Sequence, residues 1–82
     1  MATLPWNTIS EELYEAIEGQ QAKTLALARR IVPHATADDI LQPNDFPELE
    51  NNPEFRYEEG VMHGLMAAEA LFRRLASAED FS

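Results

Sequence analysis

Glu59 and His63 lie four residues apart, a spacing that places both side chains on one face of a helix. A carboxylate and an imidazole arranged in this way can hold a metal ion together, although ordinary surface pairs have the same spacing. Di-iron carboxylate helix bundles use Glu-x-x-His, whereas the residue three before His63 is Gly60. A ferritin-like metal site would therefore need more carboxylates, and Glu15 and Glu18 of a second chain are the candidates.

A second acidic pattern, Glu-x-x-Glu-x-x-Glu, is formed by Glu12, Glu15 and Glu18. Helical nucleotide hydrolases hold magnesium with repeated acids of this kind, but the second half of the chain offers no matching pair. Acids in the first turns of a helix are also expected because they interact favourably with the positive end of its dipole. We predict no cofactor, and a divalent or transition metal is the ligand that these acids would accept.

Glu69 is a third acid of interest because apolar residues frame it, and a partly buried carboxylate can act as a functional acid. Arg73 follows four residues later, in the order that favours an exposed ion pair on one helix. The ion pair is the favoured interpretation. Since no serine has a base at a recognisable spacing and no glycine-rich phosphate loop is present, the sequence favours a protein that is not an enzyme.

Charge excludes several classes of partner. The 82 residues carry a formal net charge of −9, from fifteen acidic and six basic residues, and no basic stripe that could bind nucleic acid. Anionic membranes are disfavoured for the same reason, and no apolar stretch approaches the roughly 20 residues that span a bilayer. We find no signal peptide and no cysteine, which together predict a cytoplasmic protein without disulfides.

The chain is predicted to form one domain whose first long helix covers residues 10–32, after an N-terminal arm at 1–9 that packs through Trp6. Ser10 is a suitable N-cap and Pro33 ends the helix. Its centre is polar at Gln20, Gln21 and Thr24, which form either a wet patch or a buried layer that sets the register of packing. The apolar face consists of Leu13, Tyr14, Ile17, Thr24, Leu25, Ala28, Ile31 and Val32.

Residues 33–52 are predicted to be a linker with short helical turns. Thr36 to Asp39 resembles a capping box, and Pro47 can begin another turn. Ile40, Leu41, Phe46 and Leu49 are spaced to fold back over one end of the helices. The linker is acidic, but it contains no glycine and therefore no EF-hand loop.

The second long helix is predicted at 53–77, followed by a tail at 78–82. Asn52 and Pro53 make a good helix start, an N-cap residue followed by proline at the first position. Two apolar strips follow on different sides of the helix. The main stripe consists of Tyr57, Val61, Leu65, Ala68, Leu71, Phe72 and Leu75, and the flanking strip of Phe55, Met62 and Met66.

These elements predict an all-α antiparallel two-helix hairpin. One partner helix cannot cover both strips of the second helix, so we expect a dimer that forms a four-helix bundle. Small residues at Gly19, Gly60 and Gly64 would permit close packing of helices. The predicted interface residues are Leu13, Ile17, Thr24, Ala28, Ile31, Val61, Met62, Leu65, Met66 and Phe72.

The function predicted from this pattern is protein–protein interaction, as a small acidic adaptor or regulatory module. Two alternatives remain: a metal-binding hairpin that uses Glu59, His63, Glu15 and Glu18 across a dimer, and a magnesium-dependent nucleotide hydrolase. A methionine-rich and aromatic strip is typical both of a dimer core and of a groove for another protein. The sequence does not distinguish these two roles.

Overall fold

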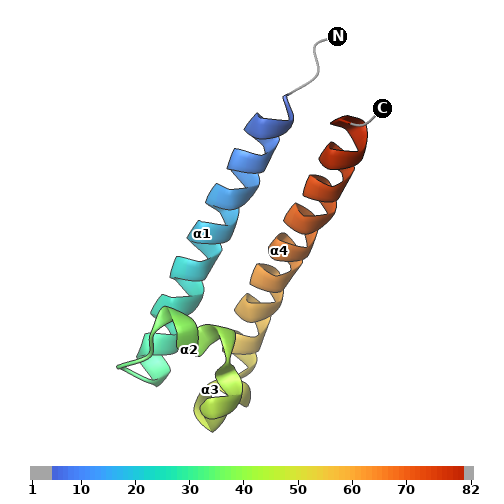
Figure 1. The fold of residues 1–82 in the computed structure, drawn as a ribbon. Coiled ribbons are helices and arrows are strands. Elements are labelled where there is room, and N and C mark those ends of the chain that lie inside the picture. The colour runs from blue at the N-terminus through green and yellow to red at the C-terminus, as the bar shows by residue number, and fades with distance from the viewer. Residues whose placement is uncertain (1–4, 81–82) are drawn as a thin grey trace.

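Two long helices make up most of the fold, which was obtained as a computed structural model that describes residues 5–80. α1 (Trp6–Ile31) and α4 (Pro53–Asp80) lie side by side and run in opposite directions (Figure 1). Three short elements cross one end of the pair: α2 (Ala37–Leu41), the 3₁₀ helix η1 (Pro43–Asp45) and α3 (Pro47–Glu50). The molecule is a rod of 48 × 19 × 19 Å. The all-α prediction is confirmed, and the described part of the chain contains no strand.

α1 begins four residues before the predicted start, so Ser10 is not its N-cap. The carbonyl of Pro5 accepts hydrogen bonds from the backbone N–H groups of Thr8 and Ile9, at 3.1 and 3.2 Å. The first turn also packs on α4, because the rings of Trp6 and Phe72 lie 4.6 Å apart between centroids and are tilted by 51°. The rest of the predicted arm, residues 1–4, lies outside the described residues.

The short elements of the linker begin where local signals predict them. Asp39 N–H donates to the Thr36 hydroxyl at 3.3 Å, and Thr36 N–H donates to the Asp39 carboxylate at 2.8 Å, which completes the capping box. Asn52 caps α4 by accepting a hydrogen bond from Phe55 N–H at 2.9 Å. α4 then continues to Asp80, through the start of the predicted tail, and residues 81–82 are outside the described range.

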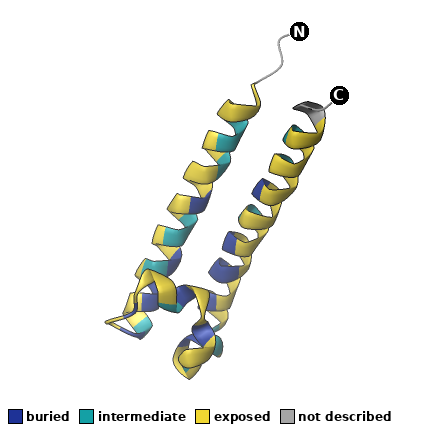
Figure 2. Ribbon diagram, in the orientation of Figure 1, coloured by how far each residue is buried: buried dark blue, intermediate teal, exposed yellow. Residues whose placement is uncertain are grey.

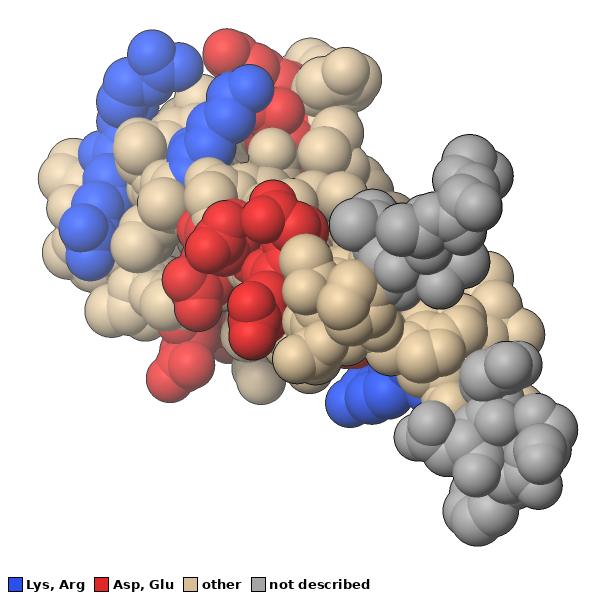
Figure 3. Space-filling view, turned by 90° about the horizontal axis from the view of Figure 1, so that it is seen from above, with Lys and Arg blue, Asp and Glu red and all other residues tan. Residues whose placement is uncertain are grey.

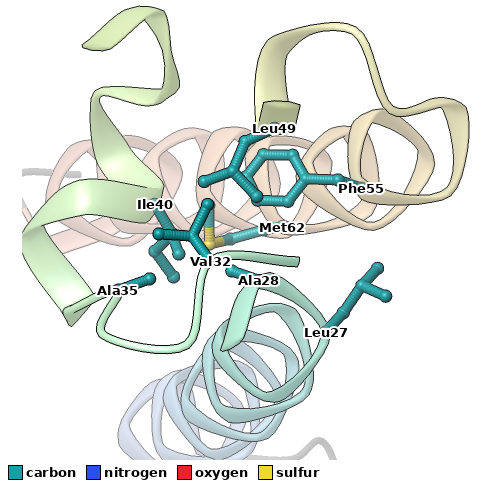
Figure 4. Packing of buried hydrophobic residues seen from close by; sticks show 8 residues of the cluster. All are labelled: Leu27, Ala28, Val32, Ala35, Ile40, Leu49, Phe55 and Met62. Carbon is teal, nitrogen blue, oxygen red and sulfur yellow. The ribbon is translucent and has the colours of Figure 1, made fainter. Parts of the chain in front are cut away.

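The hydrophobic core lies at the linker end of the rod, as the buried positions in Figure 2 and the packed side chains in Figure 4 show. Ile40 and Leu49 fold back onto the helices as predicted, whereas Leu41 remains exposed. Toward the end that carries the termini, Ile17 is the one further buried apolar residue among those described. The core cluster consists of Leu27, Ala28, Val32, Ala35, Ile40, Leu49, Phe55 and Met62.

Most of the main stripe predicted for the second helix does not pack on α1, although its member Phe72 contacts Trp6. α4 buries Phe55 and Met62 instead, together with Glu58, Glu59 and Glu69. The two faces are separated by about a third of a turn around the helix. The core residues of the linker select between them because Leu49 and Ile40 cover the strip that begins at Phe55. The main stripe consequently lies largely on the surface.

The predicted close packing at glycines is not found within the chain. A β-carbon added at Gly19, Gly60 or Gly64 would meet nothing from the other elements of the chain within 4 Å. These glycines therefore loosen their helices without allowing a close approach of α1 and α4.

Replacing Gly19 by alanine is expected to stabilise the fold by about 0.5–1 kcal/mol, because glycine in a helix loses more backbone entropy on folding. The melting temperature should rise by roughly 4–8 °C per kcal/mol in a chain of this size. Thermal unfolding followed by circular dichroism at one protein concentration measures the shift. Ala22→Gly, at another exposed position of α1, should lower the melting temperature by a similar amount.

Candidate functional site

Within one chain the four predicted metal ligands are not brought together, and the predicted site, which takes Glu15 and Glu18 from a second chain, stays a prediction. Glu59 is buried, and one of its carboxylate oxygens accepts a hydrogen bond from Arg56 at 2.7 Å. His63, Glu15 and Glu18 are exposed, the first on α4 and the other two on α1. Within residues 5–80, no group of three histidine or acidic side chains is placed to hold a metal ion.

Arg56 connects α4 to the end of α3. Its Nε donates to the backbone carbonyl of Glu50 at 2.8 Å, and its Nη1 donates to Glu59 at 2.7 Å. Glu50 adds a weak ion pair at 3.9 Å through its own carboxylate. The buried carboxylate of Glu59 thus positions the arginine that closes the linker, which is a structural role.

A polar layer crosses the middle of the helix pair. Thr24 is fully buried and donates to the backbone carbonyl of Gln20 at 2.7 Å. The Gln20 amide donates across to the backbone carbonyl of Glu58 at 3.1 Å, and Lys23 pairs with the Glu58 carboxylate at 3.0 Å. This polar segment is buried at Thr24 and half-buried at Gln20 and Gln21, so the buried layer is found in part, and it lies between α1 and α4 of one chain. Because its partners are specific, it sets the register of the two helices.

Oppositely charged side chains pair near the linker end. Arg30 lies 3.6 Å from the Glu54 carboxylate, and together with Lys23 and Glu58 these residues line a shallow depression of about 250 Å³. Arg29 turns away and donates instead to the backbone carbonyl of Ala35 at 2.9 Å. Its role is therefore to hold the chain where it leaves α1.

A larger groove of about 500 Å³ lies between α1 and α4 toward the end that carries the termini. The carboxylate of Glu69 is buried in its wall and pairs with Arg73 at 3.3 Å, so the predicted ion pair is present but is less exposed than expected. Tyr14 and Met66 are exposed at the groove. Its lining residues are Tyr14, Ile17, Glu18, Gln21, Met66, Glu69, Ala70 and Arg73.

The outer side of α4 carries an uninterrupted uncharged row, here called the outer row. Successive members are separated by 4, 3, 4, 3 and 4 residues, the spacing with which one helix faces another along its length. Tyr57 is 70% exposed, and Val61, Leu71 and Leu75 are 36%, 48% and 52% exposed. The outer row consists of Tyr57, Val61, Gly64, Ala68, Leu71 and Leu75, all of which are classed as exposed.

The predicted interface residues are distributed over several environments. Ile17, Thr24, Ala28 and Met62 are buried between the elements of one chain. Leu13, Ile31, Leu65 and Phe72 are half-buried, and Val61 and Met66 are exposed. The prediction omitted the other members of the outer row, although their 4–3 spacing was visible in the sequence.

Charged side chains are unevenly distributed over the rest of the surface. In Figure 3, which looks down on the molecule, acidic side chains gather near the middle and most basic ones lie toward one margin. The linker itself is acidic, while Arg29, Arg30 and Arg56 lie beside it at the ends of the long helices. Its five acids are Asp38, Asp39, Asp45, Glu48 and Glu50.

Comparisons with known proteins add no family or relative. The chain matches no protein-family model, no curated protein and no solved structure. Among residues 5–80, no helix has both the length and the apolar character needed to cross a membrane.

Replacing Arg56 by lysine is expected to destabilise the fold by about 1 kcal/mol, because a single ammonium group cannot bond both Glu50 and Glu59 in the same geometry. Thermal unfolding should show a melting temperature lower by several degrees. Arg74→Lys is the matched control, since Arg74 is exposed on the same helix. Equal effects of the two substitutions would contradict the structural role assigned to Arg56.

Proposed function

We propose that this protein is an interaction module whose binding surface is the outer row of α4, and that a second copy is its first partner. The observation that carries the proposal is that the outer row runs along five turns of α4, is exposed, and contains no charged residue. A solvent-facing helix surface is normally polar, and large exposed apolar patches mark sites of association. Pairing of two chains through α4 would assemble the two helical hairpins into a four-helix bundle.

The total surface of the chain supports association. Its accessible area is 5805 Å², whereas a compact monomer of 9.3 kDa would expose about 5000 Å². The excess of about 800 Å² reflects the elongated shape of the rod and is of the same order as the area that one partner typically buries in a stable protein–protein interface. A bundle of two chains would remove from water the surface that a single rod leaves open.

The uneven core supports the same conclusion. The core cluster extends along α4 only from Phe55 to Met62, so the half of the rod beyond it is held by Ile17, the Trp6–Phe72 contact and half-buried side chains. Ala68, Leu71 and Leu75 of the outer row lie in that half. A partner helix packed on them would provide the apolar cover that α1 does not.

The acidic surface suits an adaptor or regulatory role, because it keeps the pair soluble and disfavours contact with nucleic acid. A metal-dependent function would require carboxylates gathered around one ion. Glu59 is instead engaged by Arg56, while Glu15 and Glu18 lie exposed on the other long helix. The contacts therefore favour interaction over metal chemistry.

Replacing Ala68 by aspartate is expected to raise the dimer dissociation constant at least tenfold, because each partner would bury an unpaired charge at the interface. Solution mass measured by light scattering over a dilution series should be about twice 9.3 kDa for the native chain and should fall toward 9.3 kDa for the variant.

Ala22→Asp is the matched control, because Ala22 is an exposed alanine within α1 and the intrinsic cost to the helix is the same. It should leave the mass unchanged. Circular dichroism should show both variants folded. A native chain that remains monomeric at high concentration would refute the proposal, and so would a loss of dimer in both variants.

A further inference from the structure

We infer that the two copies pair with their α4 helices antiparallel, about a two-fold axis at the level of Met66. This inference rests on the proposed function, since it specifies how the outer rows meet. It assigns a partner to each position: Tyr57 faces Leu75 of the second copy, Val61 faces Leu71, and Gly64 faces Ala68.

The outer row is symmetric about its midpoint. Gly64 and Ala68 each lie two residues from Met66, Val61 and Leu71 each lie five away, and Tyr57 and Leu75 each lie nine away. A two-fold axis that reverses a helix brings each residue opposite its counterpart. Large side chains therefore meet large ones at both ends, and the two smallest residues meet at the centre.

The centre of the row allows the helices to approach closely. Gly64 has open space where its β-carbon would be, and Ala68, one turn later, is also exposed. Small residues at a crossing point reduce the distance between helix axes, while the larger side chains on either side fill the space above and below. The glycine that does no packing within the chain thus acquires a role in the pair.

Helix dipoles distinguish the antiparallel from the parallel arrangement. Opposed dipoles attract when two helices lie side by side, whereas aligned dipoles repel each other. The acids of the linker add little to this preference, because Arg29, Arg30 and Arg56 lie at the same end of the rod.

Single cysteines test the orientation directly, because the native chain has no cysteine and each introduced thiol has no competitor. Val61→Cys and Leu71→Cys alter exposed positions outside the core cluster, so the fold should be retained. In an antiparallel pair these two positions face each other. Under mild oxidation, a mixture of the two variants should form a disulfide-linked dimer, whereas either variant alone should not.

The distances make the two outcomes distinct. Position 61 of one chain would lie about 15 Å along the axis from position 61 of its antiparallel partner. That separation exceeds the limit of about 7 Å between the α-carbons of a disulfide. In an equal mixture roughly half of the dimers contain one chain of each kind, so about half of the protein should cross-link.

Ala22→Cys on α1 is the control and should not cross-link alone or in mixtures. Efficient cross-linking of Val61→Cys with itself would overturn the antiparallel arrangement and leave dimerisation intact. A dimeric mass without cross-linking in any mixture would also overturn it. A monomeric mass before oxidation would overturn the proposed function itself, so the two failures are distinguishable.

Discussion

The burial of Phe55 beside Leu49, where the linker folds back onto the long helices, determines how α4 is oriented around its own axis. A helix that turns Phe55 and Met62 inward must also turn Glu58, Glu59 and Glu69 inward, because they share that side. It must present its longest apolar row to the outside. This orientation is favoured because Ile40 and Val32 complete the packing around Phe55 at the linker end, and a rotation of α4 would expose them.

The buried glutamates are tolerated because each has a cationic partner with an exposed end. Lys23 reaches Glu58 from α1, while Arg56 and Arg73 reach Glu59 and Glu69 from neighbouring turns of α4. Within the described part of the chain, all buried side-chain nitrogen and oxygen atoms have hydrogen-bond partners. Burying a charge is costly unless it is paired in this way. The ion pairs of the buried glutamates and the apolar outer row on the surface thus both follow from the orientation of α4 about its axis.

Local signals in the sequence predicted much of the fold. The helix start at Asn52 and the capping box at Thr36 depend on hydrogen bonds between neighbouring residues, so short-range pattern was sufficient to identify them. The inner face of α4 could not be predicted, since Tyr57 and Phe55 both belong to apolar strips of helical spacing and the choice depends on distant linker residues. The burial of Glu59 could not be predicted either, because it follows from the same orientation of α4. The outer row was visible as part of the main stripe, but most of its members were left out of the predicted interface.

The concentration of the core at one end also has a kinetic consequence. Ile31 and Pro53 are separated by only about twenty residues, so closing the loop between the long helices costs little chain entropy. We expect folding to begin where the linker, the end of α1 and the start of α4 meet, and to proceed toward the termini by adding successive helical turns. A chain with such local connectivity should fold in microseconds to milliseconds. The turns farthest from the linker would then be the last to form and the first to open, which makes the end of the rod that carries the termini its most labile part.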